Sequence, residues 1–302
     1  DKLGTTVERD IELGSLRSYI DWTPFFHVWE LKGKYPSIFD NPDFGDAARE
    51  LYDNAQLILD RIIDEKLLQA HALFGFFPAN SDGDDVIVYS DDTRTREWLR
   101  FYMLRQQIAK ASDKPNYSLA DFIAPVGSEV KDYLGAFVVS AGFGTDELAA
   151  QFEADHDDYN SIMVKALADR LAEALAEKLH EEVRQHWGYG LEEHLTTAEL
   201  IKEAYRGIRP APGYPACPDH TEKRTLWELL DVDAQLGIRL TTGLAMIPAA
   251  SVCGFYFSHP EARYFNVGLL GRDQIESYAA RKGLNPEEIE HWLSPNLGYS
   301  PD

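Results

Sequence analysis

Apolar residues recur at helical spacing over two long stretches of the chain. Between residues 46 and 68 they form one stripe, which predicts an amphipathic helix. This stripe consists of Leu51, Ala55, Ile58, Leu59 and Ile62. Between residues 146 and 187 they follow one another at steps of four, as Met163, Leu167, Leu171, Leu175, Leu179, Val183 and Trp187. Because a step of four overshoots a turn of about 3.6 residues, we expect one long helix, capped by Thr145, that curves across a core or meets several neighbours.

Capping residues mark further helices. Thr23 and Pro24 suit the N-cap and first position of a short helix over residues 25–31. Thr196 and Glu199 have capping-box spacing, and Gly207 is placed to end the helix that they begin.

Three more helices are expected. One begins near Asp219 and Glu222, again at capping-box spacing, and ends at Gly237. Another begins at Asn285 and Pro286 near the C-terminus. Residues 95 to 111 are also predicted to be helical.

Runs of β-branched and aromatic residues predict strands between these helices. They include residues 86–89, 135–142 and 250–258, and a fourth run begins at Arg263. The short connection over residues 259–262 predicts that the last two form an antiparallel hairpin. Irregular alternation of helices and strands favours the α+β class. We therefore expect one large domain over residues 1–302, in which several helices, one of them long, pack on a twisted antiparallel sheet.

The charge of the chain argues against two kinds of partner. Its 302 residues carry 29 Lys and Arg against 51 Asp and Glu, a formal net charge of −22. Such a chain repels phosphate backbones and anionic lipid, so neither nucleic acid nor a membrane surface is an expected partner. No apolar run is long enough for a membrane span. With two cysteines and no export signal, the expected location is the cytoplasm.

Familiar metal and nucleotide motifs are missing. No H-E-x-x-H, G-x-G-x-x-G, P-loop or G-x-S-x-G pattern occurs, so no catalytic residue and no metal ligand is nominated. Residues 80–85 imitate the start of a calcium loop but hold Asp85 where glycine is needed, so we expect a turn. The acidic residues at 155–158 are expected to form a solvated helix face, with a ligand site as the alternative.

The segment of residues 207–219, GIRPAPGYPACPD, has an unusual composition. Four of its thirteen residues are proline, which makes the backbone stiff and leaves carbonyl groups free. Gly213 permits close approach of the backbone, and Arg209, the cation of the segment, can grip a carboxylate with two parallel hydrogen bonds. The segment suits a small ligand with a carboxylate at one end and a flat ring at the other, although a rigid connector is the alternative.

Arg209, Gly213, Tyr214 and Pro215 form the pattern R-x-x-x-G-Y-P within YRGIRPAPGYPACPDHTEK. This string resembles the S-adenosylmethionine signature in the activation domain of cobalamin-dependent methionine synthase. Further strings, including DWTPFFHVWELKGKYP, FPANSDGDD and YFSHPEARYF, resemble that family in the same order over nearly the whole chain. The family domain is the last of four modules, so the resemblance implies a piece of a longer enzyme.

The resemblance implies a set of ligand-binding residues. Asp21 would receive the α-amino group of S-adenosylmethionine, since Thr23 is expected to cap the helix, and Arg209 would bind the carboxylate. The remaining expected contacts are backbone groups of Ala211, Gly213 and Tyr214 to the adenine, the rings of Tyr264 and Phe265, and, less specifically, Glu173 and Glu203. Because neighbours in a strand face opposite ways, we expect Tyr264 alone of the two rings to face the ligand.

The resemblance also implies a function. The domain would present S-adenosylmethionine to cobalamin on a neighbouring module, and flavodoxin or a flavoprotein reductase would supply the electron for reductive remethylation in methionine biosynthesis. No D-x-H-x-x-G cobalamin motif occurs, so cobalamin is expected on another module of the polypeptide, as is zinc, and the isolated domain is expected to be inactive. The alternatives are a non-catalytic S-adenosylmethionine-sensing or assembly module and a stand-alone small-molecule methyltransferase.

Overall fold

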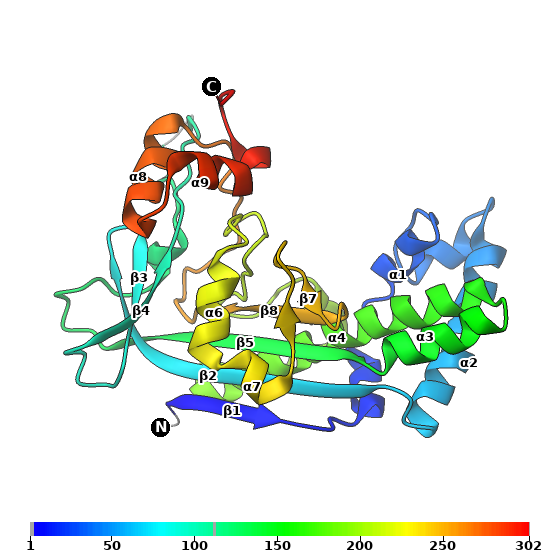
Figure 1. The fold of residues 1–302 in the computed structure, drawn as a ribbon. Helices are drawn as coiled ribbons and strands as arrows, with labels where there is room; N and C mark the ends of the chain where they lie inside the picture. Colours follow the sequence, from blue (N-terminus) through cyan, green and yellow to red (C-terminus); the bar gives the residue numbers. More distant parts are fainter. Residues whose placement is uncertain (1–2, 111–112, 302) are drawn as a thin grey trace.

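A computed structural model describes residues 3–110 and 113–301 and is built around a twisted antiparallel sheet (Figure 1). The strands are β1 (Gly4–Glu8), β2 (Gln69–Asp82), β3 (Asp85–Tyr89), β4 (Glu97–Tyr102), β5 (Asp132–Phe143) and β8 (Ser251–Tyr256). They run in the order β4-β3-β2-β5-β8. The 14-residue β2 pairs with β5 along one edge and with β1 and then β3 along the other. A separate ribbon joins β6 (Arg239–Leu240) to β7 (Met246–Ile247). The predicted α+β class is confirmed.

Both faces of the sheet are covered by helices. Ala72 and Phe74 of β2 belong to a core shared with α2 (Gly45–Asp64) and α4 (Asp158–Trp187). Leu73 and Phe77 point to a second core with α6 (Glu222–Leu230) and α7 (Val232–Leu236). Successive side chains of a strand face opposite sides, and because both faces are covered, β2 is buried almost throughout. Figure 1 shows α4 on one side of the sheet and α6 on the other.

The predicted long helix is broken in two. α3 (Thr145–Ala154) ends before the acidic residues, and α4 begins at Asp158, the last of them. His156 has φ +59°, which ends a right-handed helix, and Asp157 caps α4 by accepting the Asn160 N–H at 3.0 Å. The acidic residues therefore form a helix junction rather than a helix face. The N-cap of α3 is Gly144, not Thr145.

Two further predictions are wrong. Residues 97–102 form β4 instead of a helix, because Phe101 and Met103 are buried at period two; residue 111 lies outside the described residues. Residues 262–269 adopt no regular structure and form no hairpin with β8. The edge of β8 is occupied instead by residues 208–210, where Ile208 and Phe257 exchange two backbone hydrogen bonds of 3.0 Å.

Several shorter predictions are confirmed, some only in part. The capping box of Thr196 and Glu199 begins α5 (Thr197–Ile201) as predicted, but the helix ends at Ile201, so the prediction that Gly207 ends it is wrong. Gly83 forms the tight turn between β2 and β3, in agreement with the turn expected there. α9 (Pro286–Trp292) begins where Asn285 and Pro286 predict it, whereas α1 (Thr23–Val28) begins earlier than predicted, with Trp22 and not Thr23 as its N-cap. The remaining short elements are the 3-10 helices η1 (Leu13–Tyr19), η2 (Ser37–Asp40), η3 (Leu119–Phe122) and η4 (Ser294–Asn296).

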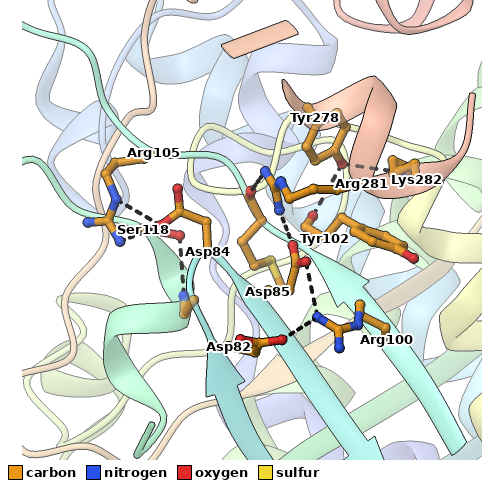
Figure 2. A network of polar contacts seen from close by, with 12 residues as sticks. Asp82, Asp84, Asp85, Arg100, Tyr102, Arg105, Ser118, Tyr278, Arg281 and Lys282 are labelled. Carbon is orange, nitrogen blue, oxygen red and sulfur yellow. Dashed lines mark hydrogen bonds and ion pairs between the residues drawn. The ribbon is translucent and has the colours of Figure 1, made fainter. Parts of the chain in front are cut away.

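α8 (Arg272–Lys282) and α9 pack on each other around a small third core that includes Leu104 and Val267. A polar network, drawn in Figure 2, fastens α8 to the sheet. Arg281 pairs with Asp85, which also lies 3.3 Å from Arg100 of β4. Burial of the Asp85 carboxyl outweighs these two cations and raises its pKa. Across the described residues, no helix is both long and apolar enough to cross a bilayer.

Candidate ligand site

The proline-rich segment, residues 207–219, runs along the edge of β8. Its Pro210 carbonyl accepts the Phe255 N–H at 2.8 Å, next to the two bonds between Ile208 and Phe257. Gly254 makes this approach possible, because a Cβ there would lie 2.7 Å from the Pro210 oxygen. The ligand segment is therefore fixed to the rigid centre of the fold.

Gly213 shapes the turn of the segment. Its φ is +94°, and a Cβ would lie 2.2 Å from Cε1 of His220. The Gly213 N–H donates to the Cys217 carbonyl at 2.7 Å, and the Cys217 N–H donates to the Tyr214 carbonyl at 2.9 Å. These bonds close the segment on itself and leave the Tyr214 side chain 60% exposed.

The C-terminal end of the segment is held by α8. Asp219 is 1% exposed, and its carboxylate lies 2.8 Å from Lys282 Nζ and accepts the Tyr278 hydroxyl at 2.8 Å. Burial acts to raise the pKa of Asp219. The charge of Lys282 and the hydrogen bonds from Thr221 outweigh burial, so the pKa lies below its usual value. Lys282 also pairs with the buried Glu222, whose pKa burial raises to about 7. Both ends of the segment are thus anchored.

A cavity of about 270 Å³ lies between the segment, α4 and β8. Its size is close to the lower end of the range for small-molecule sites, ~300–1,000 Å³. Seven of the nine predicted site residues line it: Glu173, Glu203, Arg209, Ala211, Tyr214, Tyr264 and Phe265. Two larger hollows, about 940 and 500 Å³, lie beside β1 and contain none of the nine. Four distant stretches of sequence therefore meet in the small cavity.

Arg209 lies at the centre of the polar contacts. Its Nη1 is 2.8 Å from Glu177 Oε2 on α4 and 3.2 Å from the Tyr205 hydroxyl. Its backbone N–H donates to the Tyr264 hydroxyl at 2.9 Å. Burial acts to lower the pKa of Arg209, but Tyr205, Glu177 and Tyr264 outweigh it and raise the pKa. The guanidinium is therefore a permanent cation at the wall of the cavity.

Tyr264 and Phe265 both line the cavity, but the strand alternation from which a single ligand-facing ring was expected does not exist here. This is because their segment is not a strand. Phe265 also packs near Tyr117 and Phe122, with ring centroids 6.0 and 6.4 Å away.

Glu173 and Glu203 bring carboxyl groups to the same cavity. Burial raises the pKa of both, while Arg209 acts in the opposite direction on each. The site thus combines one cation with carboxyl groups that ionise above their usual pH, a distribution suited to a ligand with charges of both signs.

Two predicted residues lie elsewhere. Gly213 supports the segment from behind and does not line the cavity. Asp21 is also absent from the lining, and its Oδ1 accepts the Thr23 N–H at 3.0 Å. Trp22, not Thr23, occupies the N-cap of α1, so the argument that Thr23 leaves Asp21 free was wrong. The roles of Gly213 and Asp21 in ligand binding stay predictions.

Sequence reasoning missed residues that complete the site. Glu177 pairs with Arg209, Tyr205 contacts the same nitrogen, and Phe137, Val252 and Cys253 contribute lining. The spacing of Glu177, four positions after Glu173 on one helix, was the available signal, because such residues share a helix face.

Residues that could hold a metal or act as a nucleophile were also sought. In residues 3–110 and 113–301, no three His, Cys, Asp or Glu side chains converge on a position for a metal ion. Cys217 and Cys253 are free and buried, and burial raises the pKa of Cys253 to about 12. A thiol protonated at neutral pH is a poor nucleophile. The described geometry therefore favours binding and orientation over chemistry by these side chains.

Two comparisons with known proteins fit this geometry. A solved structure, the MetH reactivation domain bound to AdoHcy, is 53% identical in sequence. The match covers 99% of this chain and 92% of that chain, with a TM-score of 0.95. Residues 12–283 match the family described as vitamin B12 dependent methionine synthase, activation domain. This chain belongs to that family of methionine synthase activation domains.

Proposed function

We propose that this chain binds S-adenosylmethionine in the Arg209 cavity and presents its methyl group to cobalamin carried by a neighbouring module of methionine synthase. The observation that carries the proposal is the convergence of seven expected ligand residues on one cavity. The similar reactivation domain was solved with AdoHcy, the product that S-adenosylmethionine leaves after losing its methyl group, and this supports the assignment.

The charges of the cavity suggest how the ligand lies. Arg209 pairs with the ligand carboxylate through a charge-assisted hydrogen bond. Glu173 and Glu203 face the cationic sulfonium and stabilise its charge. The adenine lies against the backbone of Ala211 and the exposed ring of Tyr214. Asp21 is proposed to receive the α-amino group with the carboxylate oxygen that does not bond to Thr23.

The work of this chain is to bind and align its ligand. Cobalamin, when reduced, supplies the nucleophile that takes the methyl group as the carbon–sulfur bond breaks. Displacement at a sulfonium needs neither a general acid nor a general base. Phe137, Val252 and Phe265 exclude water around the ligand, and the fixed segment holds its orientation. Orientation of this kind contributes up to ~7–11 kcal/mol to lowering a barrier.

Other parts of the proposal concern partners. The electron comes from flavodoxin or a flavoprotein reductase, cobalamin and zinc are held by other modules, and the reaction takes place in the cytoplasm. A formal charge of −22 disfavours direct contact with an acidic flavodoxin, so docking requires a local basic patch or contact through another module.

The test mixes this domain with the cobalamin module in the cob(II)alamin state, S-adenosylmethionine and an electron donor. We expect S-adenosylhomocysteine and a change in the visible corrin spectrum only when all components are present. Binding without transfer in the complete mixture would indicate a sensing or assembly module. Methylation of a small acceptor without cobalamin would indicate a stand-alone methyltransferase and overturn the proposal.

A further inference from the structure

The guanidinium of Arg209 has one occupied side and one open side. Nη1 lies 2.8 Å from Glu177 and 3.2 Å from the Tyr205 hydroxyl. Within residues 3–110 and 113–301, neither Nε nor Nη2 forms a hydrogen bond. The Arg209 side chain is 18% exposed and that of Glu177 is 9% exposed, so this ion pair lies largely out of contact with solvent.

Guanidinium binds a carboxylate best through two parallel N–H groups, which requires a free edge. Because Glu177 and Tyr205 hold Nη1, the edge formed by Nε and Nη2 is the one left for a ligand. We propose that Glu177 is a positioning residue, which turns this edge of Arg209 toward the carboxylate of the bound nucleoside amino acid. This inference rests on the proposed function and deepens it.

Glu177 is itself well placed to act as an anchor. It belongs to the 30-residue helix α4, and the described residues offer Arg209 no other carboxylate partner at ion-pair distance. One turn along, His180 is fully buried, stacks on Tyr256 at 5.1 Å and meets Tyr205 edge-on at 4.7 Å. These rings fix the helix surface from which Glu177 projects.

His180 adds no competing charge. Burial, followed by the nearby Arg209 and Arg184, lowers its pKa well below the usual value, so the ring is neutral at neutral pH. Among the residues that the structure describes, neither ring nitrogen has a hydrogen-bond partner, nor do Glu177 Oε1 and the two terminal nitrogens of Arg184. Glu177 is therefore the carboxylate that sets the orientation of Arg209 in this buried cluster.

Positioning and competition predict opposite effects. If Glu177 merely competed with the ligand carboxylate for Arg209, removing its charge would strengthen binding. If Glu177 orients Arg209, replacing the charge-assisted contact by a neutral one would weaken binding. Arg209 Nη1 and Glu177 Oε2 form an ion pair at 2.8 Å, and loss of its charge should weaken binding of the ligand carboxylate about fivefold, which corresponds to about 1 kcal/mol.

The experiment compares two ligands by calorimetry. S-adenosylhomocysteine carries the carboxylate, whereas 5′-methylthioadenosine keeps the adenosine and lacks the amino acid. We expect Glu177→Gln to weaken S-adenosylhomocysteine about fivefold and to leave 5′-methylthioadenosine unchanged. Glu182→Gln is the matched control, because Glu182 lies on the same helix and pairs with Lys178 at the surface. It should bind both ligands as the unmodified chain does.

The outcomes separate the two proposals. If the unmodified chain binds neither ligand, the proposed function fails. If it binds S-adenosylhomocysteine and Glu177→Gln binds it equally well or more tightly, the positioning role is refuted. Equal losses for both ligands would refute it too, since the effect would then not pass through the carboxylate. Glu177→Asp, which keeps the charge but is one methylene shorter, serves as a second variant if Glu177→Gln does not fold, and it should also weaken S-adenosylhomocysteine alone.

Discussion

Replacement of Arg209 by alanine tests the centre of the site. The open edge of the guanidinium offers N–H groups to a carboxylate, and each charge-assisted hydrogen bond contributes roughly 1.5–3 kcal/mol. One such bond corresponds to an affinity loss of about tenfold to about a hundredfold. We therefore expect Arg209→Ala to weaken S-adenosylmethionine at least about tenfold. The variant also leaves Glu177, 7% exposed, without its counter-ion, so its melting temperature should fall.

A second variant separates affinity from stability. Arg209→Lys keeps a cation beside Glu177 but loses the planar guanidinium with its two parallel N–H groups. Its melting temperature should therefore be close to that of the unmodified chain, but it should bind S-adenosylmethionine weakly. Arg206→Ala is the matched control, because Arg206 bonds to the Ser258 carbonyl and does not line the cavity. Calorimetry gives the affinities and thermal unfolding gives the stabilities. Binding by Arg209→Ala as tight as that of the unmodified chain would refute the assignment of Arg209.

Further predictions concern the rest of the site. Gly213→Ala should lower both ligand affinity and melting temperature, since its Cβ would collide with His220; an unchanged melting temperature would contradict this. Asp21→Asn should weaken S-adenosylmethionine and S-adenosylhomocysteine alike in calorimetry, whereas a loss confined to the sulfonium ligand would refute its amino-group role. As pH falls through the raised pKa values of Glu173 and Glu203, the affinity for S-adenosylmethionine should fall relative to that for S-adenosylhomocysteine; an affinity ratio that does not change with pH would refute the contact of these carboxylates with the sulfonium.

The elements that could be predicted from sequence are those with a strong local signal. The stripe from Leu51 to Ile62 predicted α2, and the capping box of Thr196 predicted the start of α5. The break between α3 and α4 was missed because the stripe of four-residue steps begins at Met163, beyond the break, and carries no information about it. The available signal for the break was Asp157, which caps α4 by accepting the N–H of Asn160. We interpreted Asp157 instead as part of a charged helix face.

The hairpin of β8 with the run after Arg263 was predicted wrongly, because a segment distant in sequence pairs with β8 instead. The run after Arg263 has strand-like residues, but residues 208–210 occupy the β8 edge that it would need. Pro210 has no N–H to give, yet its carbonyl still pairs with Phe255. The strand preference of a segment's own residues does not determine which of two segments pairs with the edge of β8.

The site was predicted largely through resemblance, and physical reasoning from the residues added only part of it. Composition drew attention to the proline-rich segment and to Arg209. It contained no sign that α4 would bring Glu177 beneath Arg209, because that contact depends on the packing of α4 against the sheet. Contacts between distant helices, strands and loops depend on tertiary packing, which cannot be read from a single sequence.

The ion pair between Asp219 and Lys282 links the ligand segment to α8. If α8 opens locally, Lys282 leaves and two buried carboxyl groups, Asp219 and Glu222, lose their counter-ion. That cost couples the opening of α8 to the opening of the ligand segment. The amide hydrogens that close the segment, such as that of Cys217, should therefore exchange with solvent through the same cooperative opening as the amides of α8. We therefore expect the helix pair at the C-terminal end and the ligand segment to unfold as one unit.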